Sequence, residues 1–175
     1  MPEKLKAFGD ILHDLLNDLP DHDAITDTLD YVLGALYGLT LAYNLGYADR
    51  PGSQVSVYRP YLADYALRIP LNQNIDGLWK SGFYFNSGIQ RLASAFDRIP
   101  QMLGAKESTA KKRMAKVNPA GCPHWELIYD EINVFKHDPV GKAAGRTALM
   151  SDAVAAFEEM LTLIVTNKTE IKARF

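Results

Sequence analysis

Apolar residues recur along most of this chain at intervals of three and four, the spacing that places them on one face of a helix. Two such stripes run Leu5, Phe8, Leu12, Leu15 and Leu19, then Ile25, Leu29, Val32, Leu36, Leu39 and Tyr43. Pro20 separates them because proline disrupts a continuing helix, and Asp21 or Asp23 is suited to cap the second helix. The pattern therefore predicts a helical hairpin over residues 1–47.

The same spacing continues beyond a loop that contains Pro51 and Gly52. It predicts a modest helix over 57–68, a long helix over 76–104 and a closing helix over 146–170. Pro100 is expected to kink the long helix or end its last turn. A shorter helix is expected over 124–137, and the segment 105–123, which lacks the periodicity, is interpreted as a basic loop.

No alternating strand pattern of useful length and no internal repeat appears in the 175 residues. The sequence therefore predicts a single all-α domain over 1–175, a helical bundle of four main helices plus one or two short ones. Small residues indicate where two helices approach closely. They are Gly34 and Gly38 in the hairpin and Ser81, Gly82, Ser87 and Gly88 in the long helix.

Composition narrows the class of protein. The chain is 47% hydrophobic with a formal net charge of -2, which excludes a mainly disordered chain and gives no general polybasic character. One cysteine excludes an internal disulfide framework. Residues 31–48 carry no charge, but their glycines and tyrosines favour a helix enclosed by protein over a membrane span. The first residues lack a secretory signal pattern, so we expect a cytoplasmic protein with no membrane partner.

Two candidate ligand sites are set aside. The glycine spacing of 141–147 does not match a phosphate loop, although glycines and two cations before a helix can hold a phosphate. Asp10, Asp14 and Asp18 lie four residues apart beside His13, on the face opposite the leucine stripe, so a solvated helix face is favoured over a metal site. No metal and no cofactor is predicted.

The most informative stretch is 131–138, with Asn133, His137 and Asp138 at helical spacing. This pattern resembles the motif of the HEPN superfamily (higher eukaryote and prokaryote nucleotide-binding domains), in which an Arg often followed by Asn precedes a His. The order of a long helix, a short motif helix, a loop and a final helix over 79–164 also resembles that family. The resemblance implies a small helical bundle.

The resemblance further implies RNA binding or metal-independent RNA cleavage, with His137 in proton transfer and Asn133 beside it. The positions open to the motif Arg hold Asp130, Glu131 and Ile132, so it remains open whether the chain is a ribonuclease. Candidate residues for phosphate or RNA contact are Arg91, Lys136, Arg146, Lys111, Lys112 and Arg113. Alternatively, His137 caps helix carbonyls and Asn133 is a buried hydrogen-bonding residue.

Partners follow from the same resemblance. HEPN-like bundles commonly form homodimers, and the family suggests a role in stress response, phage defence or a toxin-antitoxin pair. A non-catalytic helical module that binds a protein partner, or an anion through the cations of 106–116, is the alternative.

Overall fold

The protein is described by a computed structural model that covers residues 1–45, 73–137 and 149–175, with side chains for 1–45, 81–133 and 149–175. These residues form helices and no strand, which confirms the all-α prediction. The helices are α1 (Pro2–Asp18), α2 (Asp23–Asn44), α4 (Gln73–Met102), α5 (Ala110–Val117), α6 (Pro123–His137), α7 (Met150–Thr166) and α8 (Lys168–Arg174).

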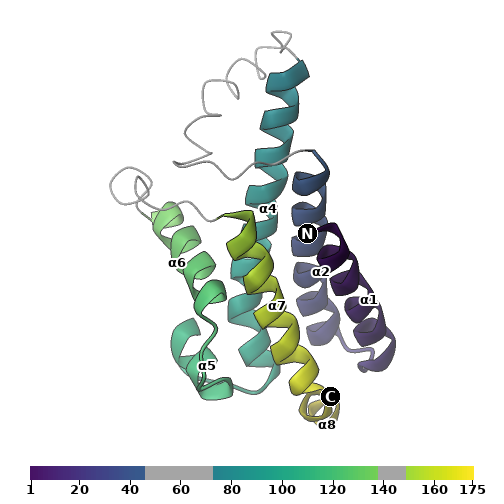
Figure 1. Cartoon of the computed structure of the whole chain (residues 1–175). Helices are drawn as coiled ribbons and strands as arrows, with labels where there is room; N and C mark the ends of the chain where they lie inside the picture. Colours follow the sequence, from purple (N-terminus) through teal and green to yellow (C-terminus); the bar gives the residue numbers. More distant parts are fainter. Residues whose placement is uncertain (46–72, 138–148) are drawn as a thin grey trace.

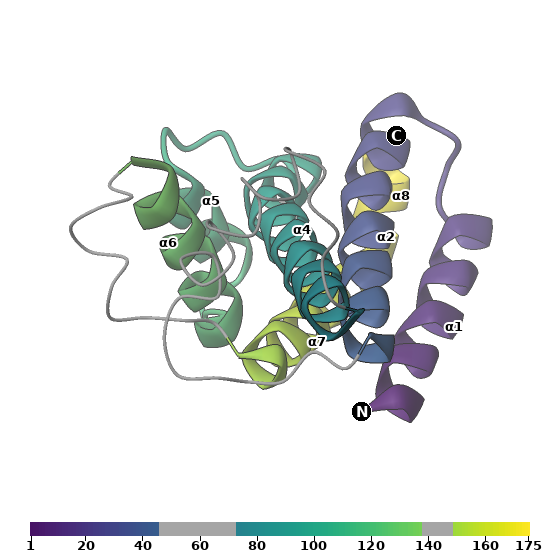
Figure 2. The same cartoon turned by 90° about the horizontal axis from the view of Figure 1, so that it is seen from above.

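The long helix α4 is the centre of the arrangement (Figure 1). Seen from above, α2 and then α1 lie on one side of it, and α5 and α6 lie on the other (Figure 2). α7 contacts α4, α6, α1 and α2, and it therefore joins the two sides. α8 follows α7 and contacts it at the end of the bundle.

Apolar faces of these helices meet in one continuous core. Phe96, Trp125 and Phe157 are fully buried, and the ring of Phe8 stacks on Phe157 with centroids 5.0 Å apart. The two predicted N-terminal stripes supply this core, and among their members only Leu36 and Tyr43 are partly buried. Burial of apolar surface at about 25 cal/mol per Å² is the main stabilising contribution.

The small residues of α2 and α4 bring the two backbones into contact, as their positions predicted. A Cβ added to Gly38 would lie 2.8 Å from the Gly88 nitrogen and 2.8 Å from the Tyr84 carbonyl oxygen. One added to Gly88 would lie 3.1 Å from the Leu39 nitrogen. Glycine is required at Gly38 because any side chain would separate the helices.

Pro100 does not end α4, which continues to Met102. The helix closes instead at Gly104, whose φ of 83° lies in the left-handed region. The Gly104 nitrogen donates to the Gln101 carbonyl oxygen and the Ala105 nitrogen donates to that of Pro100. This pair of bonds is the Schellman ending, which satisfies carbonyls at the end of a helix.

The cap of α2 differs from the prediction. His22, between the two aspartates, is the N-cap, and its Nδ1 accepts a hydrogen bond from the Ala24 nitrogen at 3.2 Å. An imidazole nitrogen serves here as the acceptor that a carboxylate was expected to supply. The hairpin itself is confirmed by α1 and α2.

Two further differences concern the basic and closing segments. The prediction of a loop over 105–123 is wrong for Ala110–Val117, which form α5. Thr109 caps this helix, and Ala110 and Met114, four residues apart, are buried. The closing helix is interrupted at Asn167, after which α8 begins. The helix expected over 57–68 lies outside the described residues.

None of the described helices combines the length and the apolar character that a membrane span requires.

Candidate functional site

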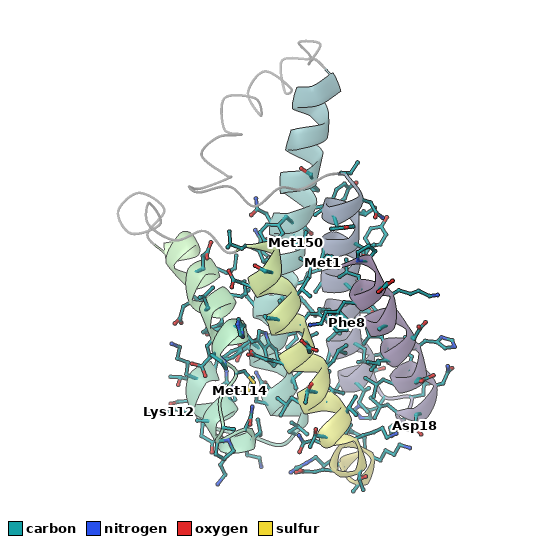
Figure 3. The ribbon with its side chains drawn as sticks, viewed as in Figure 1. Met1, Phe8, Asp18, Lys112, Met114 and Met150 are labelled. Carbon is teal, nitrogen blue, oxygen red and sulfur yellow. The ribbon has the colours of Figure 1, made fainter. Side chains whose placement is uncertain are left out.

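Two of the four cations of α5, Lys111 and Arg113, are held in ion pairs with other helices. Figure 3 shows Lys112 on the outer side of this helix and Met114 directed toward the bundle. Lys111 forms an ion pair with Asp130 of α6 at 2.8 Å, and this hydrogen bond raises the pKa of the lysine. Lys112 is exposed and forms no ion pair with a described residue. Of the predicted RNA contacts on this helix, Lys111 is therefore held in an ion pair, whereas Lys112 is not.

Arg113 is the most firmly held cation of α5. Its Nη2 pairs with the Asp97 carboxylate of α4, and its Nη1 donates to the Glu107 carbonyl oxygen at 2.6 Å. The Arg113 side chain is 15% exposed, against 45% for Asp97. A guanidinium fixed at two points on a rigid scaffold loses little further freedom, so this pair is better organised than the exposed Lys111 pair.

A polar pocket of about 270 Å³ lies where α2, α4 and α6 meet, and we name it the Arg98 pocket. α4 contributes the largest share of its wall because residues three and four apart share a helix face. Its lining residues are Tyr31 from α2, Ala93, Ser94, Asp97 and Arg98 from α4, and Tyr129 and Asn133 from α6. Polar side chains from three helices therefore converge on one concave site.

Two arginines flank the ring of Tyr31 at this pocket. The Arg98 guanidinium lies 4.2 Å from the ring centroid, and its Nη2 donates to the Tyr31 hydroxyl at 3.3 Å. The Arg91 guanidinium lies 5.9 Å from the same centroid, and its side chain passes over Gly34. Cation–π contact orients both guanidinium groups without cancelling their charge.

Charge in the Arg98 pocket is unequally compensated. The one carboxylate among its lining residues, Asp97, is paired with Arg113. No described carboxylate pairs with Arg98. The positive charge of Arg98 is therefore available to an anion, whereas the negative charge beside it is largely neutralised.

The structure brings one predicted site residue into this pocket and another beside it. Asn133 lines the pocket, and Arg91 lies at Tyr31 on its border. His137 is the last residue of α6, one helical turn beyond Asn133. The side chains of His137 and Lys136 and the whole of Arg146 lie outside the described residues.

Sequence reasoning missed Arg98, Tyr31 and Tyr129. Tyr129 stacks on Phe96 with centroids 4.6 Å apart, which fixes its ring at the pocket. The spacing of seven residues from Arg91 to Arg98 was the available signal, because it places both on one face of the long helix. Nothing in the sequence indicated that Tyr31, in another helix, would pack against them.

A larger groove of about 530 Å³ lies between α5, α6 and α7 but does not suit a phosphate. Glu158 and Glu159 line it. The Glu159 carboxylate accepts bonds from the backbone nitrogens of His124 and Trp125 and contacts His124 Nδ1 at 2.8 Å, so it caps α6. Burial raises the pKa of Cys122 in the same groove, which disfavours a reactive thiolate.

Among the described residues, no group of three or more His, Cys, Asp or Glu side chains is arranged to hold a metal ion. The carboxylate of Asp18 instead binds Lys168 and Lys172. Searches against protein-family models, curated proteins and solved structures found no match to this chain.

Proposed function

We propose that this chain binds RNA at the Arg98 pocket. We further propose that it cleaves the bound RNA without a metal ion, which is the activity that the resemblance to HEPN-like proteins implies. The observation that carries the proposal is the uncompensated charge of Arg98 beside Asn133, one turn before His137 on α6. A guanidinium binds phosphate oxygens through a planar fork of donors, and a carboxamide adds a neutral donor. Arg98 thus supplies from α4 the cation that the motif on α6 lacks.

RNA carries its own nucleophile, which is why this chemistry needs no bound metal. The 2′-hydroxyl attacks the adjacent phosphorus, and the 5′-oxygen of the next nucleotide leaves. The histidine of the motif takes and gives the protons of this exchange, and a nearby cation stabilises the charge on the phosphate. We assign these two roles to His137 and Arg98.

Cleavage is tested with a short single-stranded RNA in the presence of a metal chelator. We expect the wild type to cleave and His137→Ala to lose at least about a hundred-fold in rate, the usual contribution of a general acid or base. His13→Ala is the matched control, because His13 is exposed on α1 and hydrogen-bonds Asn17 on the same helix. Equal cleavage by the wild type and His137→Ala contradicts the catalytic assignment.

Binding is tested separately with Arg98→Met, which keeps much of the aliphatic length and removes the charge. We expect affinity for the same RNA to fall about ten-fold and the dependence on salt to lose about one phosphate contact. Lys6→Met is the matched control, since it removes an exposed cation of α1 outside the Arg98 pocket. Binding without cleavage by the wild type identifies a non-catalytic RNA-binding form, and no binding overturns the proposal.

One observation favours the alternative of a non-catalytic anion-binding module. Lys106, Lys116 and Arg174 line a cavity of about 370 Å³ at the end of the bundle, together with Glu107 and Glu170. Arg174 is paired with Glu170 at 2.6 Å, which reduces the net positive charge there. The alternative is favoured if Lys106→Met with Lys116→Met abolishes RNA binding while Arg98→Met leaves it unchanged.

A further inference from the structure

Arg113 lies next to the Arg98 pocket but is not among its lining residues. It reaches the pocket only through Asp97, which belongs to the pocket wall and pairs with the Arg113 guanidinium. Arg113 was predicted from sequence as an RNA contact. Its low exposure and its two fixed partners point to a different role.

The second partner of Arg113 explains why the pairing is stable. The Glu107 carbonyl oxygen, in the connection between α4 and α5, accepts from Arg113 Nη1 at 2.6 Å. Thr109 caps α5 and fixes the start of the helix that carries Arg113. α5 therefore holds the guanidinium in place against Asp97 before any ligand arrives, which is the condition for an electrostatic effect without reorganisation.

Without Arg113, Asp97 would present a bare carboxylate to an incoming phosphate, immediately beside Arg98 in sequence and in the same pocket wall. The two charges of the wall would then nearly cancel. With Arg113 in place, the Asp97 carboxylate is neutralised, so the positive charge of Arg98 dominates the electrostatic potential of the pocket. The field inside the pocket thus depends on a residue that does not line it.

We propose that Arg113 is a positioning residue that makes the Arg98 pocket cationic by neutralising Asp97, so that α5 sets the affinity of this pocket for RNA phosphate. This inference rests on the proposed function and deepens it. It assigns α5 an indirect role in recognition, in place of the direct contact expected from its sequence. Lys111 is less suited to such a role, because it pairs with Asp130, which does not line the pocket.

The test is a double-mutant cycle read out by binding of a short single-stranded RNA. We expect Arg113→Gln to weaken binding about five-fold, because a bare charge near the phosphate costs on the order of 1 kcal/mol at an intermediate dielectric. Asp97→Asn alone should bind more tightly than the wild type, because it removes a carboxylate from the pocket wall and leaves the charge of Arg113 uncompensated. Arg113→Gln combined with Asp97→Asn should return to within about two-fold of the wild type, because the two substitutions remove opposite charges and leave the pair neutral.

A purely structural role would not be rescued by removing the carboxylate, so rescue is the distinguishing result. Lys111→Gln is the matched control and should change affinity less than Arg113→Gln. If Arg113→Gln fails to fold, Arg113→Lys keeps the charge and should bind near the wild-type level. The inference alone is overturned if the double variant binds RNA as weakly as Arg113→Gln. It is also overturned if Arg113→Lys binds as weakly as Arg113→Gln. A wild type that does not bind RNA overturns the proposed function and this inference with it.

Discussion

The two sides of α4 are built on different principles. Toward α2, the helix presents Gly88 to Gly38, and the backbones touch. Toward α5 and α6, it presents Phe96 to Trp125 and Asp97 to Arg113, so long side chains and ion pairs fill the space. The α2 side is a close backbone contact bordered by Arg91 and Arg98 on Tyr31, whereas the α5 and α6 side combines an aromatic core with ion pairs.

We therefore expect the α2 side of α4 to contribute most to stability and the α5 and α6 side to contribute most to recognition. Close backbone packing leaves no room for added atoms, so the α2 side is where small changes are most damaging to the fold. Exposed or half-exposed ion pairs contribute little to stability, so those on the α5 and α6 side are free to vary at small cost to folding. The site of proposed function lies where the two sides meet over α4, with Tyr31 from one and Asn133 from the other.

Enlargement of Gly38 is expected to have the largest effect on stability. We expect Gly38→Ala to reduce the free energy of unfolding by about 3 kcal/mol, because its Cβ would clash with backbone atoms, which cannot rotate away. Chemical denaturation of the two proteins measures this loss.

Gly9→Ala is the matched control for Gly38, since both glycines lie within helices. The nearest atom to a Cβ at Gly9 is Leu36 Cδ2 at 3.9 Å, an ordinary contact. Alanine there should be neutral or stabilising by about 0.5–1 kcal/mol through its helix propensity. If both substitutions have the same effect, close approach is not what distinguishes the α2 side.

On the opposite side of α4, the contact between Phe96 and Trp125 is expected to have the next largest effect. Trp125 is buried, its Nε1 donates to the Leu92 carbonyl oxygen at 2.7 Å, and its ring meets Phe96 edge to face at 5.1 Å. We expect Trp125→Phe to cost about 1–3 kcal/mol in free energy of unfolding, from a lost hydrogen bond and unfilled volume.

Tyr37→Phe serves as the comparison variant because Tyr37 is 66% exposed. It should change stability by less than about 0.5 kcal/mol. A loss for Trp125→Phe that exceeds the loss for Gly38→Ala reverses the ranking of the two sides.

The smallest effect concerns Asp18, which ties α1 to α8 through surface ion pairs. Hydrogen bonds from Lys168 and then Lys172 lower the pKa of Asp18 from 3.8 to about 2. A carboxyl whose pKa is depressed on folding stabilises the protein above its unfolded pKa and loses that contribution as pH falls through its folded pKa. Asp18→Asn should therefore be slightly less stable than the wild type near neutral pH, and the gap should close between pH 3.8 and about 2.

Thermal unfolding across this pH range measures the gap, with Asp14→Asn as the control. Asp14 lies one turn earlier on α1 and forms no ion pair with a described residue. A gap for Asp18→Asn that persists below pH 2, or an equal gap for Asp14→Asn, excludes the ion pairs as its cause.

Most of the fold could be predicted from the sequence because buried positions recur along the chain at the helical period. The stripes of α1, α2, α4 and α7 and the small residues between α2 and α4 are local patterns. α5 escaped prediction because its eight residues carry just two buried side chains, Ala110 and Met114, amid four cations. Such a helix is stabilised by docking on α4 rather than by its own periodicity.

Less of the site could be predicted from the sequence, because it depends on contacts between residues of different helices. Asn133 was identified through its motif, and its neighbour His137 lies at the expected end of α6. Arg113 and Asp97 are 16 residues apart and belong to different helices, so the sequence did not reveal that they cancel each other's charge. Arg98 is a candidate phosphate ligand because that cancellation leaves its own charge uncompensated. The tertiary structure was needed to show this.

Nuclear magnetic resonance can locate the RNA-binding surface of this protein. Backbone amide resonances are followed while a short single-stranded RNA is added to the full chain. We expect the largest shifts at Ser94, Arg98, Tyr129 and Asn133, which line the Arg98 pocket. Shifts confined to Lys106, Lys116 and Arg174, or no shifts at all, would contradict the assignment of RNA binding to this pocket.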